Sequence, residues 1–381
     1  MAIRRLDVAV DQQDYVVNWT QREDKRNVVL HAVGSAGNRT GYVFGMHLNF
    51  DPALDREEVE RAAFAAGDYE MPAAFRRYAR VWLKGDHDKP LEEFLRARTC
   101  KGRSAGSLDH VIEATYAEAL ERSDVEVSEI KNPSVRLPRN GMQIHSEYTL
   151  YGHFHLLRSL FGGVGKVNFY LDQDSGMRAA CLSAFAQEIR DGGVDAFYVR
   201  LAKGLTVPEK QSALTRSRAE IYAWQERYPD LSPQEIEFLM IREQMRSMHE
   251  IGKWNDRWLR HPFPNMSEPE KAVCYLTDRG TLHEDHLAWL YYRASLHGID
   301  RFFMQVRRRL SLLERAIGTA STARRMWYGY SAYDPEMIVK VLGLFRVYYN
   351  FVLVGQDGAT TAIRTGLADA SLRVEDFFYH Q

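Results

Sequence analysis

The stretch KVNFYLDQDSG, residues 166–176, decides the fold. Its apolar residues alternate with Asn168 and Tyr170, which predicts a β-strand that buries one face. Two acids, Asp172 and Asp174, follow where this strand ends, and an amphipathic helix begins directly after them. One interpretation is a strand–helix turn in which an acid caps the helix. The alternative is that one of the two carboxylates binds a metal ion.

Composition excludes several classes of protein. The 381 residues are enough for one large domain with insertions or for two domains, and 45% of them are hydrophobic, which is ample for a core. The net charge of −1 does not indicate nucleic acid overall, but residues 306–325 contain six arginines. The three cysteines lie far apart in no disulfide or zinc-binding pattern, which favours a reducing compartment. Without a signal peptide or a membrane-length apolar run, we expect a soluble cytoplasmic protein with no membrane contact.

Strand-like and helix-like segments alternate along the chain in five blocks. The turn GNRTG at 37–41 joins two strands of the first block, which reads as an antiparallel meander. A later strand–helix–strand unit is normally parallel and right-handed. Together they predict an α/β protein with a ribonuclease H-like mixed-sheet core and large helical insertions. The blocks are 1–51 with three or four antiparallel strands, 52–165 as a helical insertion, 166–205 as the strand–helix–strand unit, 206–300 as a second helical insertion, and 301–381 as the C-terminal helices.

A core of this kind carries metal-binding acids on its first strand, at the end of its fourth strand and on a late helix. Three carboxylates at these places can bind two Mg²⁺ or Mn²⁺ ions through hard oxygen ligands. Two such ions can activate a water or a 3′-hydroxyl and stabilise the leaving oxygen of a phosphodiester. The candidates are Asp11, Asp172 and Glu314, with Asp7, Asp14 and Asp174 as alternatives for the strand acids and Glu336 as the alternative for the late helix.

Residues 301–317, RFFMQVRRRLSLLERAI, are predicted to form one helix that carries the third acid. Leu310, Leu313 and Ile317 would form its apolar face, with Glu314 beside that face. A surface salt bridge is the simpler interpretation of Glu314 taken alone. The arginines of this region are predicted to neutralise DNA phosphates. They are Arg307, Arg308, Arg309, Arg315, Arg324 and Arg325.

Five short motifs follow one another in an order that resembles a DDE transposase of a bacterial insertion sequence. They are VDQQDYVVNW (10–19), FYLDQDSG (169–176), LLERAI (312–317), FRVYYNF (345–351) and DGATTAIRTGLA (357–368). The resemblance implies a ribonuclease H-like, retroviral-integrase-like catalytic core that cleaves and rejoins DNA with Mg²⁺ or Mn²⁺. It implies that Asp11, Asp172 and Glu314 are the catalytic metal ligands. Transposon ends and target DNA would be the partners, and a homodimer stays open.

The chain departs from this pattern in three places. It begins almost at the first strand, so we expect it to lack the N-terminal zinc-binding or helix-turn-helix region that recognises transposon ends. Thr360-Thr361-Ala362 lacks the proline of the family's segment, and the spacings of 161 residues from Asp11 to Asp172 and 142 from there to Glu314 are long. Two other functions therefore stay open: a catalytically inactive DNA-binding or regulatory derivative, and a ribonuclease H-like nuclease.

Two histidine-rich segments have structural interpretations. Residues 143–157, QIHSEYTLYGHFHLL, predict an aromatic-rich helix that packs on the core, with a zinc site as the alternative. Residues 281–292, TLHEDHLAWLYY, do not match the HExxH arrangement and predict the start of a helix with acids in its first turn.

Overall fold

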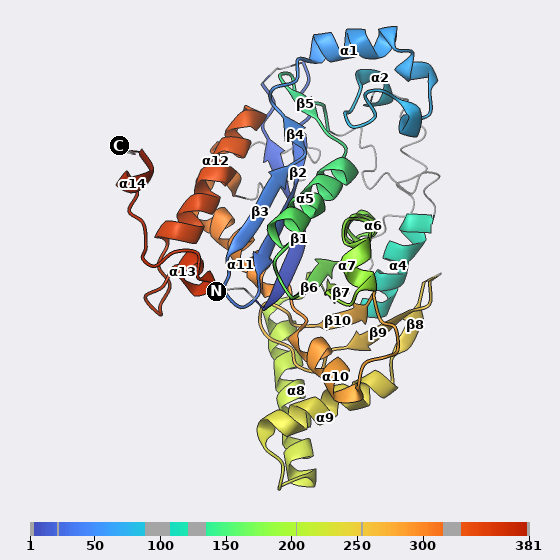
Figure 1. Cartoon of the computed structure of the whole chain (residues 1–381), viewed down its shortest axis with the longest axis vertical. Coiled ribbons are helices and arrows are strands. Elements are labelled where there is room, and N and C mark those ends of the chain that lie inside the picture. Colours follow the sequence, from blue (N-terminus) through green and yellow to red (C-terminus); the bar gives the residue numbers. More distant parts are fainter. Residues whose placement is uncertain are drawn as a thin grey trace. The chain divides into compact units, whose positions relative to one another are not determined.

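The predicted α/β class and large mixed sheet are confirmed. The structure is a computed structural model that describes residues 4–20, 23–87, 107–120, 135–202, 204–252, 254–314 and 329–378. Eight strands form one sheet in the order β3-β2-β1-β6-β7-β10-β9-β8 (Figure 1). The chain divides into two units. Unit 1 comprises 1–9, 103–125 and 163–297, and unit 2 comprises 10–102, 126–162 and 298–381, so that strand β1 (Arg5–Val17) runs through both.

The meander of unit 2 matches the sequence pattern closely. Strands β2 (Val28–Gly37) and β3 (Val43–Leu48) are antiparallel and are joined by the predicted turn. Gly41 has φ +74°, a left-handed conformation that favours glycine, and its amide donates to Gly37 O at 2.8 Å. The first strand of this block, β1, is 13 residues long and contains Asp11.

Helices cover both faces of the β2–β3 pair. A Cβ built at Gly45 would lie 2.9 Å from the ring of His153 on α5, whereas one at Gly34 would lie 2.7 Å from Ile299 on α11. The ring of Phe302 packs on α12 and the turn that follows it, 5.1 Å from the ring of Tyr349. The predicted aromatic-rich helix is thus confirmed as a core helix (Figure 1). These helices are α5 (Ser146–Leu160), α11 (His297–Arg309) and α12 (Pro335–Val347).

Local capping sets the ends of the shorter elements of unit 2. Asp55 accepts a hydrogen bond from the Glu58 amide and begins α1, and Thr360 caps α13 in the same way through the amide of Ile363. The remaining elements are β4 (Phe50–Asp51) paired with β5 (Met142–Gln143), α1 (Arg56–Ala65), the 3₁₀ turns η1 (Asp68–Glu70), η2 (Ala73–Phe75) and η3 (Ser311–Leu313), α2 (Lys84–His87), the π-helical turn η5 (Tyr348–Val352), α13 (Thr361–Thr365) and α14 (Glu375–Phe378).

Unit 1 is built on the predicted parallel pair. Strand β6 (Lys166–Asp172) pairs in parallel with β7 (Val194–Leu201), and α6 (Ser175–Ala184) with α7 (Ala186–Arg190) connects them. Residues 167–171 of β6 are all buried. The expectation of one buried face was therefore wrong, because β6 is an interior strand of the sheet with β1 and β7 as its neighbours.

The block 206–300 is less helical than predicted. Helices α8 (Val207–Arg227) and α9 (Pro233–Arg246) begin with capping boxes and prolines, which the sequence shows. Between α9 and α10, however, lie three short strands in a block that was predicted to be helical. Pairing with β7, not local periodicity, fixes β10 as a strand. These elements are β8 (His249–Ile251), β9 (Asp256–Arg260), β10 (Lys271–Tyr275) and α10 (Glu284–Arg293), and α4 (Leu108–Leu120) lies beside β7 and β8.

No helix within the described ranges is both long enough and apolar enough to cross a bilayer. The segment 281–292 does begin a helix, as expected. The ring of His283 accepts the amide hydrogen of Asp285, and Glu284 and Asp285 occupy the first turn of α10.

A buried pair of histidines joins α5 to β3 in unit 2. The Nδ1 atoms of His47 and His153 lie 2.7 Å apart, so one ring donates a hydrogen bond to the other. Burial lowers the pKa of both rings, and the nearby charge of Arg346 lowers it further. Both histidines are therefore neutral in the folded protein at neutral pH.

Folding stability should consequently fall in mild acid. The unfolded chain takes up protons on these rings below pH ~6.5, whereas the folded chain resists them, so each ring contributes up to about 1.4 kcal/mol per pH unit between pH 6.5 and its lowered pKa. His153→Gln should make the free energy of unfolding less dependent on pH between 7.5 and 5.5, measured by urea denaturation. His155→Gln, on the exposed side of α5, is the control. An unchanged pH dependence in His153→Gln would contradict this interpretation.

Candidate active site at the end of strand β6

The polar residues after β6 have separate roles. Asp174 accepts a hydrogen bond from the Met177 amide at 2.9 Å and is the N-cap of α6, which confirms the simpler interpretation of this acid. The side chain of Gln173 is buried and donates to Ile112 O of α4 at 3.3 Å. Asp172 closes the strand and is half-buried. Of the two acids, Asp172 is therefore the one that does not cap the helix.

A cation and an aromatic group lie close to the first turn of α6. The guanidinium of Arg178 binds Asp256 of β9 through Nη1 at 2.6 Å and Nη2 at 3.4 Å, and the hydroxyl of Tyr116 also donates to Asp256. Burial disfavours the charge of Arg178, but Asp256 outweighs it and raises the pKa of the guanidinium. The Arg178 guanidinium also lies 5.1 Å from the ring of the exposed Trp254. This arrangement fixes the hairpin of β8 and β9 beside α6.

Strand β1 lies beside β6 in unit 1, and a backbone and a side-chain contact show how the two strands are aligned. The amide of Lys166 donates to Arg4 O at 3.1 Å, and the side-chain amide of Asn168 donates to Asp7 Oδ1 at 2.7 Å. Both contacts advance in the same direction along the two strands, so β1 and β6 are parallel and Asn168 lies opposite Asp7.

Two arginines balance the buried charge of Asp7. Arg293 of α10 donates to Asp7 Oδ2 at 2.8 Å, and Arg5 Nε lies 3.6 Å from Oδ1. The Asp7 side chain is 2% exposed. The two guanidinium groups lie 4.1 Å and 4.6 Å from the ring of Trp289. We refer to Asp7, Asn168 and Arg293 as the Asp7 cluster. Both carboxylate oxygens of Asp7 therefore have partners within unit 1.

The buried side chain of Tyr170 lies within the electrostatic influence of the Asp7 cluster. Burial raises the pKa of Tyr170, and the negative charge of Asp7 adds to that effect. The hydroxyl of Tyr170 and Oδ1 of Asn168 are buried and have no hydrogen-bond partner among the described residues. No local sequence pattern marked Asn168 or Arg293 as members of a polar cluster. One signal was present, an amide in the middle of an otherwise apolar strand.

In unit 2, Asp11 lies on β1 and is half-buried, and its Oδ1 accepts the amide hydrogen of Gln12 at 2.7 Å. Asp14 is exposed, with Oδ1 2.7 Å from Nδ1 of His31. Gln13 is buried between them and accepts a hydrogen bond from Arg307 Nη1 at 2.8 Å. The C-terminal turn of α11 therefore lies against the β1 residues that follow Asp11.

The third candidate acid is not on a helix, and this prediction was wrong. Helix α11 ends at Arg309, Ser311–Leu313 form a 3₁₀ turn, and Glu314 is exposed with an extended backbone (φ −64°, ψ 147°). Three consecutive arginines in the last turn favour a helix C-terminus, because cations stabilise the negative end of the helix dipole. Leu313 is nevertheless buried, as its apolar character suggested, whereas Ile317 lies outside the described residues.

Three of the six predicted DNA-binding arginines can be placed. Arg308 and Arg309 are exposed, and Arg309 Nε donates to Gln305 Oε1 of the same helix at 2.7 Å. Arg307 instead contacts Gln13. The others, Arg315, Arg324 and Arg325, lie outside the described residues.

The predicted ligands are divided between the units. Asp172 belongs to unit 1, whereas Asp11 and Glu314 belong to unit 2. In the described ranges no three carboxylate, imidazole or thiol groups come together as ligands of one ion. The reserve candidate Glu336 lies 2.7 Å from Lys340 Nζ, one turn along α12, and forms a helix-surface ion pair.

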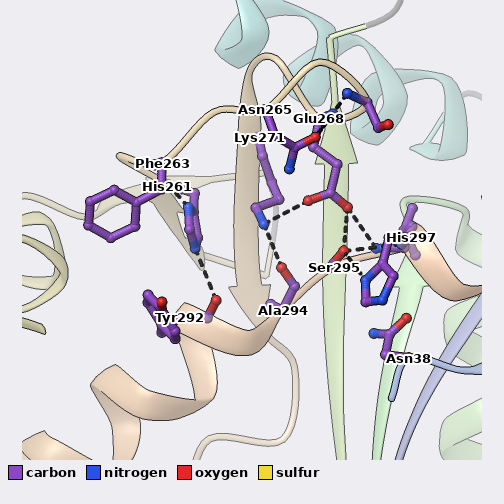
Figure 2. A network of polar contacts seen from close by, with 12 residues as sticks. Asn38, His261, Phe263, Asn265, Glu268, Lys271, Tyr292, Ala294, Ser295 and His297 are labelled. Carbon is purple, nitrogen blue, oxygen red and sulfur yellow. Dashed lines mark hydrogen bonds and ion pairs between the residues drawn. The ribbon is translucent and has the colours of Figure 1, made fainter. Parts of the chain in front are cut away.

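A second polar network in unit 1 contains a serine, a histidine and an acid, which are the residue types of a hydrolase triad (Figure 2). Buried Glu268 accepts hydrogen bonds from Lys271 Nζ at 2.9 Å, from the hydroxyl of Ser295 and from the Leu296 amide. Nδ1 of His297 lies 2.9 Å from the same Ser295 hydroxyl. Burial would raise the pKa of Glu268, but Lys271 and these hydrogen bonds lower it on balance.

The hydrogen bonds of this network do not activate Ser295 as a nucleophile. In a hydrolase triad the histidine takes the proton of the serine and the acid orients the histidine. Here Ser295 donates its proton to Glu268, and the acid contacts Lys271 instead of His297 (Figure 2). Lys271 Nζ also donates to Ala294 O at 2.7 Å. The network therefore holds the first residue of β10 against the segment between α10 and α11.

The C-terminal motifs have a structural explanation in unit 2. Asn350 on η5 donates to Val43 O and accepts from Val43 N, both at 2.9 Å, so its side chain pairs with the first residue of β3 as a neighbouring strand would. Thr361 donates to Asn350 Oδ1 at 3.0 Å. The segments 345–351 and 357–368 thus meet at the start of β3, which sequence spacing did not indicate.

No family model, no curated protein and no solved structure matches this chain.

The free energy of unfolding tests whether Asp174 stabilises α6 as its N-cap. Asp174→Ala removes the cap and should lower the free energy of unfolding by about 1 kcal/mol, whereas Asp174→Asn retains a capping side chain and should change it by only a few tenths of a kcal/mol. Urea denaturation measures both. Equal losses in the two variants would show that the charge, and not the hydrogen bond, is what stabilises α6.

Proposed function

We propose that the chain is a metal-dependent DNA-cleaving and strand-transferring enzyme of the DDE transposase type, built on a ribonuclease H-like core. The proposal rests on the sequence motifs together with the sheet order, in which β6 has β1 on one side and β7 on the other. A meander followed by a parallel strand–helix–strand unit is the arrangement expected for such a core. It brings the strand of the first acid next to the strand of the second.

The observation that carries the proposal is the register of β1 and β6. Asn168 lies opposite Asp7, and the two strands run in parallel. Asp172 is four residues beyond Asn168, and Asp11 is four residues beyond Asp7. Side chains alternate with a period of two, so four residues return to the same face. Asp11 therefore lies on the same face of β1 as Asp7, and Asp172 lies on the same face of β6 as Asn168.

The chemistry of the donors suits a hard divalent ion. Carboxylate oxygens are the ligands that Mg²⁺ and Mn²⁺ prefer, and β6 delivers Asp172 at its carboxyl end, where ligands of parallel strands commonly bind. Bound metal would supply an activated water or 3′-hydroxyl and stabilise the leaving oxygen of a phosphodiester. The chain itself would hold Asp11 and Asp172 on rigid strands, and the exposed arginines at the end of α11 would bind the DNA backbone.

One observation favours the catalytically inactive derivative as a second candidate. Glu314 lies in an exposed extended segment and not on a helix that packs on the sheet. A site with two carboxylates binds metal less firmly and with less fixed geometry than a site with three. An inactive derivative would keep the fold and DNA binding and lose cleavage.

Replacement of the two strand acids tests the proposal. Asp11→Asn and Asp172→Asn should each weaken Mn²⁺ binding, measured by the electron paramagnetic resonance signal of free Mn²⁺. Each should also slow Mn²⁺-dependent nicking of supercoiled plasmid roughly 100-fold or more, because the metal contributes several kcal/mol to stabilising the transition state. Unfolding by urea should show that both variants remain folded.

Asp14→Asn and Asp174→Asn are the matched controls, since each removes one charge from the same two segments. They should nick within about twofold of the wild type. If Asp172→Asn nicks as fast as the wild type, the site is wrongly assigned. If the wild type binds DNA but neither binds Mn²⁺ nor nicks, the inactive-derivative function is correct instead.

DNA binding by the end of α11 makes a separate prediction. Each phosphate contact releases counterions, so replacing Arg308 and Arg309 together with Ala should reduce the slope of log affinity against log salt concentration by roughly 2. Fluorescence anisotropy with a duplex oligonucleotide measures this slope. Replacing Arg216 and Arg218, two exposed arginines of α8, is the control and should leave the slope unchanged. Equal slopes for wild type and the Arg308/Arg309 variant would contradict a phosphate contact.

A further inference from the structure

Asn140 and Gly141 form the only Asn-Gly pair in the sequence, and they lie in unit 2 directly before β5. Asn140 is exposed, whereas Gly141 is buried and has φ +67°, a left-handed conformation that favours glycine. Because glycine has no Cβ, its backbone nitrogen is less shielded than that of any other residue with a backbone N–H. The Gly141 nitrogen can therefore approach the side-chain amide carbon of Asn140, and solvent reaches the same side chain.

The backbone at Gly141 lies tightly against β4. A Cβ built at Gly141 would lie 2.5 Å from the ring of Phe50 and 2.8 Å from Asp51 O, closer than real Cβ atoms approach their neighbours. The strand before it and the strand after it thus leave room for a main chain of ordinary length and for no side chain. A longer main chain at this position would displace Gly141 from β4.

Strand β5 joins several parts of unit 2. It pairs with β4, Gln143 O accepts the amide hydrogen of Trp82 at 2.9 Å, and the Gln143 side chain donates to Val29 O at 3.1 Å. Met142 is fully buried. It belongs to an apolar cluster with Val59, Ala63, Val81 and Leu83. Displacement of the residue before Met142 would therefore disturb both the strand pairing and this cluster.

We propose that Asn140 is a site of spontaneous deamidation and that its isoaspartate product separates β5 from β4. The backbone nitrogen of Gly141 attacks Cγ of Asn140 and loses its proton. A new C–N bond closes a cyclic imide, the bond from Cγ to the side-chain nitrogen breaks, and ammonia leaves. Water then opens the imide at either carbonyl, which gives aspartate or isoaspartate. The reaction needs water and no enzyme, metal or oxidant.

The two products have different effects on unit 2. Aspartate places a carboxylate at an exposed position and leaves the main chain as it was, so β5 keeps its pairing. In isoaspartate the main chain runs through Cβ and Cγ and is longer by one carbon. Gly141 has no space for this extension against Phe50 and Asp51. The isoaspartate form should therefore lose the pairing of β4 with β5, whereas the aspartate form should retain it.

The rate of conversion tests the first half of this inference. The full chain is incubated in warm, mildly alkaline buffer, and peptides are separated and identified by mass spectrometry. Asn265 is the internal control, because it is also exposed but is followed by Met266. Asn140 should convert at least about tenfold faster than Asn265, equivalent to ~1.4 kcal/mol in activation free energy, and should yield both acids. Equal rates, or an Asn140 that stays an amide while Asn265 converts, would overturn the proposal.

Hydrogen exchange tests the second half on the same samples. The amide of Ile144 donates to Asn49 O at 2.9 Å, so it reports the pairing next to β5, and the amide of Trp82 reports its bond to Gln143. Both amides should lose protection in the isoaspartate fraction of aged protein, separated from the rest by chromatography.

Two variants separate the longer main chain from the new charge. Asn140→Asp carries the charge from the start on an ordinary main chain, and fresh protein should be as protected as the fresh wild type. Asn140→Gln keeps an amide whose imide would be a larger ring that closes far more slowly, so it should stay protected through the incubation. Full protection of the isoaspartate fraction would overturn the structural effect, as would an equal loss in fresh Asn140→Asp, which would assign the effect to charge.

Discussion

The buried contact between Asp7 and Asn168 is the constraint on which much of this structure depends. It joins β1, the strand that runs through both units, to β6, the first strand of the parallel pair. A carboxylate taken out of water is costly unless it is paired and hydrogen-bonded, so the strands must meet where Asn168 and Arg293 can satisfy it. Hydrophobic burial alone would tolerate several alignments of two apolar strands. In the observed alignment, the polar contact gives the buried Asp7 carboxylate an amide and a guanidinium as partners.

A second buried ion pair constrains the chain of unit 1 in the same way. Glu268 and Lys271 are almost fully buried, and each satisfies its remaining hydrogen-bonding capacity on the segment 294–296. Removing one partner from such a network would leave an unpaired buried charge. The network thus fixes the path of the chain between α10 and α11. In unit 2 a neutral side chain has a comparable effect. Asn350 exchanges two hydrogen bonds with the backbone of Val43, as the backbone of a neighbouring strand would.

The candidate site differs from the expected one mainly in its third acid. Asp11 lies within β1, and Asp172 is the last residue of β6. Glu314 is not on the predicted helix, because that helix ends five residues earlier, after three arginines. The apolar spacing of Leu310 and Leu313 fits both a continued helix and a 3₁₀ turn, so periodicity could not distinguish them. The charges of the last turn were the informative signal.

Local sequence determined the strand 166–172, the capping of α6 by Asp174, the turn at 37–41 and the long helices with capping boxes, because each depends on neighbours within a few residues. It also identified the parallel pair, since a strand–helix–strand unit has one common geometry. Tertiary structure decided that β6 is buried on both faces and that KAVCY at 271–275 is a strand. It also brought Asp7 to Asn168, 161 residues away. These features depend on pairing between distant segments, and no local pattern encodes which distant partner will satisfy a buried polar group or the edge of a strand.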